Sequence, residues 1–349
     1  MLDFINCNIK NVIAHQVGNQ TNDEDLILSE SLLDIDDLRL RELLIKFFLY
    51  PFKNTEEYYR FNFSDGDLTL NPLYQYSNSI FSNIDSFKDK SDSIALLLYE
   101  IAIHPNIKSG DLFVTTFENI KIEDKSVNAL GIFKSEKRHE FLKLNKKTKG
   151  FSLKYDDGIN IDDLDKGCLI FNTEKENGNI LCIVDKSNKS SEAHYWKDLF
   201  LKASPIRTNY HETNQFLGIT KHFVSKQLVN NSEISKSEQI DLLNRSVNYF
   251  KTHEEFNKGE FERDVLSDEK IITSFREFDK KFRIENEIEL NDRFEISSQA
   301  VKKQARAFKR VLKLDENFDI HIKGDKKLIE KGVDTDGRKY YKIYYNEEK

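Results

Sequence analysis

The densest run of chemically active side chains is basic and lies between residues 302 and 313. Wound as an α-helix at about 100° per residue, its cations fall within an arc of roughly 120° and the apolar residues fall on the opposite side. No acidic residue interrupts the arc, so the usual ion pairs of a solvated helix are missing. The six cations are Lys302, Lys303, Arg306, Lys309, Arg310 and Lys313. They suit a polyanion, because each neutralised phosphate releases counterions. A plain solvated face is the alternative.

A second basic cluster surrounds a predicted turn after the segment 139–145. Its members are Arg138, Lys143, Lys146, Lys147 and Lys149. Such a loop is often only a solubility feature, and the functional alternative is an auxiliary phosphate contact. Few aromatic residues lie among these lysines, which disfavours stacking on bases and therefore recognition of single-stranded nucleic acid. We expect contacts to the backbone of duplex DNA with little reading of bases.

Catalytic patterns are weak in this sequence. Asp162, Glu174 and Glu176 beside Lys175 resemble a nuclease carboxylate set, but acidic residues near hairpin turns are commonly solvated. There is no Gly-rich phosphate loop and no GxSxG elbow, and the eight histidines lack metal-ligand spacing. We therefore expect a protein that is not an enzyme and that holds no metal or cofactor, with an unrecognised nuclease as the weaker alternative.

Charge and composition define the class of protein. The 349 residues carry a formal net charge of −7, so the basic segments are not a by-product of a basic chain. Acidic residues gather in residues 21–42, and this asymmetry could steer an anionic partner to one side. Three separated cysteines fit a reducing cytosol. No signal peptide and no apolar run of about 18 residues is present, so we expect no membrane association.

Periodicity predicts an α+β fold with mixed helices and an antiparallel sheet first, then a helical C-terminal region ending in a small β-meander. Asn71-Pro72 is typical of a helix start. Asn177-Gly178 between two apolar runs predicts a hairpin. We place an α+β sheet domain at 1–205 and a mainly helical domain at 206–349, with the basic helix over 298–314.

The order of these segments resembles the bacterial 37-kDa nucleoid-associated protein family. The resemblance begins with NVIAHQVGNQTNDEDLILSESLLDI and continues through SGDLFVTTF, CLIFN, HYWKDLFLKA and FKRVLKLDENFDIHIKG. It is collinear over nearly the whole chain. The resemblance implies association with the nucleoid, binding of double-stranded DNA and, for some members, a link with type II topoisomerases.

The leading hypothesis is a cytoplasmic, nucleoid-associated protein that binds double-stranded DNA mainly through phosphates. The six cations of 302–313 would make the main contacts, and Lys143, Lys146, Lys147 and Lys149 would make weaker ones. The alternative is an adaptor whose acidic 21–42 segment contacts a type II topoisomerase or another nucleoid component. A homodimer is possible through an exposed sheet edge or an amphipathic helix.

Overall fold

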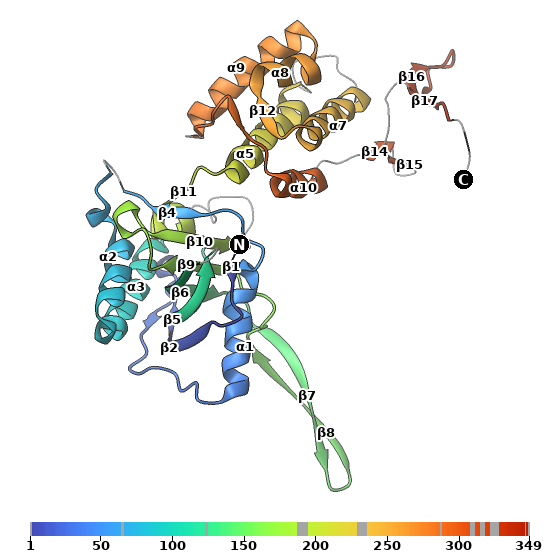
Figure 1. Cartoon of the computed structure of the whole chain (residues 1–349). Coiled ribbons are helices and arrows are strands. Elements are labelled where there is room, and N and C mark those ends of the chain that lie inside the picture. Colours follow the sequence, from blue (N-terminus) through green and yellow to red (C-terminus); the bar gives the residue numbers. More distant parts are fainter. Residues whose placement is uncertain are drawn as a thin grey trace. The chain divides into compact units, whose positions relative to one another are not determined.

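The computed structural model describes residues 2–63, 66–122, 125–186, 195–228, 236–286, 288–307, 311–314, 318–321, 328–345 and 347. The chain divides into two compact units, residues 1–206 and 207–349, each with its own hydrophobic core. Helices, a large antiparallel sheet and small terminal sheets make this an α+β fold, which confirms the predicted class (Figure 1).

The first unit is built on one antiparallel sheet, which has nine strands among the described residues. Its order is β11-β4-β10-β9-β6-β5-β2-β3, with β1 paired to β5. The strands are β1 (Leu2–Asp3), β2 (Asn8–Val17), β3 (Leu26–Ile27), β4 (Tyr59–Phe61), β5 (Gly110–Ile122), β6 (Lys125–Ser135), β9 (Lys166–Phe171), β10 (Ile180–Asp185) and β11 (Ala203–Pro205).

Helices cover both faces of this sheet (Figure 1). On one face α2 (Pro72–Ser82), α3 (Phe87–Ile101) and a π-helical segment (Tyr195–Leu201) pack on a core that includes Leu112 and Val114. On the other face α1 (Leu38–Leu49) packs on a core that includes Phe113. Successive side chains of a strand point to opposite faces, so a strand buried on both sides is apolar throughout.

Local sequence explains where these elements begin and turn. The Asn71 side chain accepts a hydrogen bond from the Tyr74 N–H, and Pro72 occupies the first turn of α2, as predicted. The predicted hairpin at Asn177-Gly178 joins β9 to β10. Gly178 has a φ of +91°, and a Cβ there would lie 2.5 Å from the Phe61 carbonyl oxygen, so only glycine fits.

A separate hairpin is inserted between β6 and β9. Its strands, β7 (His139–Lys147) and β8 (Gly150–Gly158), form a two-stranded sheet of their own. Figure 1 shows it projecting from the body of the first unit as a long arm. Almost every residue of both strands is exposed.

In its described residues, the second unit packs four longer helices around clustered phenylalanines. They are α5 (Asn209–His222), α7 (Lys236–Thr252), α9 (Glu269–Glu285) and α10 (Ser298–Ala307), with the short α8 (Lys258–Phe261) between α7 and α9. The Phe216 ring lies 4.2 Å from Phe256 and 5.1 Å from Phe261 between centroids. β12 (Glu255–Asn257) pairs with β13 (Arg293–Glu295).

Two small hairpins end the described chain, which confirms the predicted terminal β-structure. β14 (Val311–Leu314) pairs with β15 (Phe318–His321), and β16 (Ile329–Val333) pairs with β17 (Lys339–Ile343). Gly337, in the turn between β16 and β17, has a φ of +82°.

The predicted basic helix over 298–314 is wrong at residues 311–314. α10 ends at Ala307, and residues 311–314 form a strand. The reason is non-local pairing: the register places Leu312 and Leu314 opposite Ile320 and Phe318. A helical wheel drawn from one segment cannot include that competing partner.

Candidate nucleic-acid interface

The β7–β8 hairpin has two chemically different faces. Its register runs without a bulge from His139 opposite Gly158 to Lys147 opposite Gly150, so opposite residues share a face. One face, the basic face, carries Lys143, Asn145 and Lys147 on β7 and Ser152 and Lys154 on β8, with Phe141 and Asp156 at its base. Lys149 stands in the turn.

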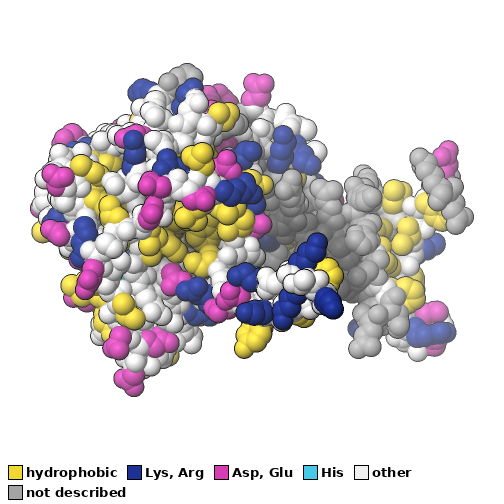
Figure 2. Space-filling model, turned by 90° about the horizontal axis from the view of Figure 1, so that it is seen from below, with side chains coloured by type: hydrophobic (Ala, Val, Ile, Leu, Met, Phe, Trp, Pro, Cys, Tyr) yellow, Lys and Arg dark blue, Asp and Glu magenta, His cyan; other side chains and the backbone are white. Residues whose placement is uncertain are grey.

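The hairpin's cations are largely available to a partner. Residues 141–155 contain five lysines and no acidic residue. Lys143 Nζ lies 3.3 Å from Asp156 Oδ2 at the base of the arm. Among the described residues, no carboxylate lies within ion-pair distance of the other four lysines, Lys146, Lys147, Lys149 and Lys154. Figure 2 looks toward the tip of the arm and shows basic side chains gathered there.

The other face of the hairpin, the apolar face, is exposed as well. It carries Leu142 and Leu144 on β7 and Phe151, Leu153 and Tyr155 on β8. Their exposed fractions run from 61% for Leu153 to 79% for Tyr155. Lys146 lies on this face near the tip, and Glu140 and Asp157 lie on it at the base. Sequence reasoning missed this face, although apolar residues two apart at 142 and 144 and at 151, 153 and 155 are its signal.

The predicted six-cation face does not exist as one helical surface. Lys302 and Lys303 are exposed on α10, and Arg306 lies on the last turn of that helix. Lys313 lies on β14, opposite Asp319 in the register. Lys309 and Arg310 lie outside the described residues.

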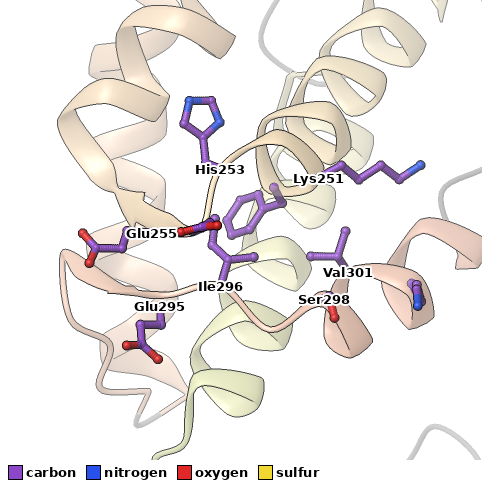
Figure 3. Close-up of a pocket in the computed structure, with 10 residues that line it drawn as sticks. Lys251, His253, Glu255, Glu295, Ile296, Ser298 and Val301 are labelled. Carbon is purple, nitrogen blue, oxygen red and sulfur yellow. The ribbon is translucent and has the colours of Figure 1, made fainter.

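The surroundings of α10 are acidic. Lys302 lines a pocket of about 710 Å³ together with Lys251, Glu254, Glu255 and Glu295. Figure 3 shows Glu255 and Glu295 on the side formed by β12 and β13, across from Ser298 and Val301 of α10. Glu255 and Glu295 are directly opposite in the register, which places two like charges side by side. Carboxylates there weaken the attraction of Lys302 for a phosphate.

The carboxylates considered for a nuclease are not brought together. Asp162 precedes β9 and pairs with Lys46 at 2.7 Å, whereas Glu174 follows β9 and pairs with Arg60. A six-residue strand separates them by about 20 Å. Within the described part of the chain, no group of three or more His, Cys, Asp or Glu residues could hold a metal ion.

The comparisons with known proteins agree with the collinear resemblance. A family model described as nucleoid-associated protein YejK matches residues 13–348, which is nearly the whole chain. The chain belongs to this family. A search of the curated proteins found no match. Membership makes it a nucleoid-associated protein, and no helix among its described residues is long and apolar enough to cross a membrane.

This family member also holds two lysines that cannot touch a ligand. Lys134 and Lys166 are opposite each other on β6 and β9 and are each 1% exposed. Lys134 Nζ lies 3.2 Å from Glu136 Oε1, and Lys166 Nζ lies 2.8 Å from Asp185 Oδ1. Burial lowers the pKa of Lys134, and Glu136 opposes that shift. Sequence reasoning missed this network, because the sequence around a lysine in a strand does not show which carboxylate the fold will place beside it.

His15, in the strand that carries the resemblance, is a structural residue. Its Nδ1 accepts a hydrogen bond from the Ser29 N–H at 3.2 Å, and its Nε2 lies 3.2 Å from Ser91 Oγ. Ser91 Oγ donates to the Lys88 carbonyl, so Nε2–H is the donor to Ser91. Burial lowers the pKa of His15, which keeps the imidazole neutral.

Proposed function

We propose that this nucleoid-associated protein binds double-stranded DNA without a chemical step, mainly through phosphates, and that the β7–β8 hairpin makes the principal contacts. The supporting observation is the arm itself, an exposed two-stranded ribbon with five lysines and no acidic residue over 141–155. The cations around α10 form a second, weaker set.

The dimensions of the arm suit a duplex. A two-stranded β-ribbon fits the major groove, which is about 12 Å wide. Nine residues in each strand span about 30 Å, close to one turn of DNA. Lys143, Lys147 and Lys154 share the basic face, so they can meet phosphates along one side of the ribbon. Asn145 and Ser152 between them can donate hydrogen bonds to phosphate or base edges.

The cations of 302–313, which the sequence predicted to make the main contacts, take a secondary place in the proposal. Lys302, Lys303 and Arg306 on α10 and Lys313 on β14 would add contacts where DNA reaches the second unit, together with Lys309 and Arg310. The carboxylates that line the same pocket as Lys302 oppose what that residue contributes. We therefore rank the arm first and the α10 cations second.

A salt titration of duplex binding by the full chain tests the proposal. Four phosphate contacts, from Lys143, Lys147, Lys149 and Lys154, give a slope of about −3.6 in log affinity against log salt, at about 0.9 per contact. A slope shallower than about −2 with wild-type protein would count against phosphate binding by the arm. Equal affinity for unrelated duplex sequences is expected, because phosphate contacts carry no sequence information.

A second candidate function is docking of a protein partner on the segment 21–42. Its acidic residues stand beside exposed apolar side chains, including Ile27 at 57% and Leu38 at 74% exposure. A partner with a basic, partly apolar surface fits this chemistry, and a type II topoisomerase is the partner that the family resemblance implies. We expect the pure protein to retain such a topoisomerase after nuclease treatment. The Leu38→Lys variant should not retain it. Retention that needs intact DNA would contradict this docking.

A further inference from the structure

The apolar face of the arm exposes large hydrophobic side chains to water. Its five side chains are Leu142, Leu144, Phe151, Leu153 and Tyr155, each at least 61% exposed. A lone two-stranded hairpin is marginally stable in water, because neither of its faces is covered. A cover for this face would therefore stabilise the arm and remove apolar surface from water.

The size of the face matches what a pair of copies needs. At these exposed fractions the five side chains offer roughly 600 Å² of accessible surface, so two copies would cover about 1,200 Å². That total is the low end of the range for specific, stable interfaces. The charged residues at the two ends of the face add to it.

The charges on this face are complementary to those of a second copy turned end for end. Lys146 lies near the tip, and Glu140 and Asp157 lie at the base, six residues away along β7. Two arms stacked antiparallel about a two-fold axis place each Lys146 over the acidic base of the other arm. Sheets stacked face to face lie about 10 Å apart, which lets the leucines and aromatic rings interdigitate.

DNA is a poorer occupant of the apolar face. Apolar side chains meet DNA chiefly as single wedges between unstacked bases, whereas this face is flat and five side chains wide. A duplex also carries no positive group to meet Glu140 and Asp157. The basic face on the other side of the ribbon is the one whose chemistry suits phosphate.

We infer that the arm is a dimerisation element, in which the apolar faces of two copies stack antiparallel into a four-stranded sandwich. Lys146 of each copy then pairs with Glu140 and Asp157 of the other. The two basic faces point outward, one on each side of the sandwich. This inference does not depend on DNA binding, since the apolar and basic faces are separate surfaces.

Sedimentation equilibrium of the full chain without DNA tests the inference. Wild type is expected to dimerise, and Leu144→Glu with Leu153→Glu is expected to weaken the dimer at least about 100-fold, because four leucines leave the interface. The matched control is Asn145→Glu with Ser152→Glu, which adds the same charge one residue along each strand on the basic face. The control is expected to stay dimeric. A wild type that is monomeric at about 100 μM, or equal weakening by both pairs, overturns the inference.

Cross-linking tests the antiparallel arrangement. Two variants are made in a Cys7→Ser background, one with Lys146→Cys and the other with Glu140→Cys. They are mixed and treated with a short bismaleimide. Tip-to-base products are expected, and Lys146→Cys alone is expected to give none because the two tips lie at opposite ends. Cross-linking of Lys146→Cys to itself overturns the antiparallel stacking. Fluorescence of Trp196, which is buried in the first unit, shows that each variant is folded.

Discussion

Two basic regions of this molecule have similar numbers of cations and different surroundings. Along the β7–β8 arm, four lysines have no carboxylate within ion-pair distance among the described residues. Around α10, Lys302 shares a pocket with Glu254, Glu255 and Glu295, and Lys303 Nζ lies 5.6 Å from the Tyr210 ring. The count of cations in a segment therefore says less about phosphate binding than the charges that the fold places beside them.

The largest expected effect follows removal of the arm's cations. Changing Lys143, Lys147, Lys149 and Lys154, the lysines of the basic face and the turn, to Gln should weaken duplex binding about 1,000-fold near 0.1 M salt and make the salt slope shallower by about 3.6, because four phosphate contacts are lost. Fluorescence anisotropy of a labelled duplex measures both quantities. The matched control changes four exposed lysines elsewhere in the first unit, Lys53, Lys121, Lys125 and Lys175, to Gln. Equal weakening by the two quadruple variants would mean that only net charge matters.

The next prediction compares the exposed lysines with the buried ones. Glu136→Gln leaves Lys134 and Lys166 buried with less compensating charge, so the first unit should lose about 3 kcal/mol of unfolding free energy. Denaturant unfolding followed by the fluorescence of Trp196 measures the loss, since it is the chain's single tryptophan. Asp156→Asn, which breaks the exposed pair with Lys143, is the control and should cost less than about 1 kcal/mol.

The pH dependence of the Glu136→Gln variant checks whether the loss of stability comes from the buried charge of Lys134. A lysine whose pKa is lowered in the folded state binds fewer protons there than in the unfolded state, so stability rises with pH through the lowered pKa. Part of the lost stability should return at alkaline pH as Lys134 becomes neutral. A loss that stays constant with pH would assign the effect to packing alone.

A smaller effect is expected at α10. Lys302→Gln with Lys303→Gln should weaken duplex binding about 5-fold, because the carboxylates of the pocket that Lys302 lines already offset part of the charge. Competition of wild type and variant for one labelled duplex resolves a change of this size. The control is Lys270→Gln with Lys280→Gln, two exposed lysines of α9. A loss as large as that of the arm variant would reverse the ranking of the two regions.

Sequence reasoning succeeded where the deciding interactions are local. The Asn71 cap, the Asn177-Gly178 turn and the order of helices and strands follow from neighbouring residues. It failed at 311–314, because the strand that these residues form depends on pairing with residues 318–321. The basic and apolar faces of the arm were open to prediction from alternation, but only the structure shows that β7 and β8 leave the main sheet.

The smallest expected effect tests whether the carboxylates of the pocket beside α10 are the reason that its cations contribute less to DNA binding than those of the arm. Glu255→Gln with Glu295→Gln removes two like charges that face each other across β12 and β13. Duplex binding should tighten about twofold at low salt, and the gain should vanish above about 0.5 M salt as charges are screened. Glu269→Gln with Glu277→Gln on α9 makes the same change in net charge and should give less. Tightening of 100-fold or more would show that the acidic pocket, rather than the arm's lysines, sets the affinity of this protein for DNA.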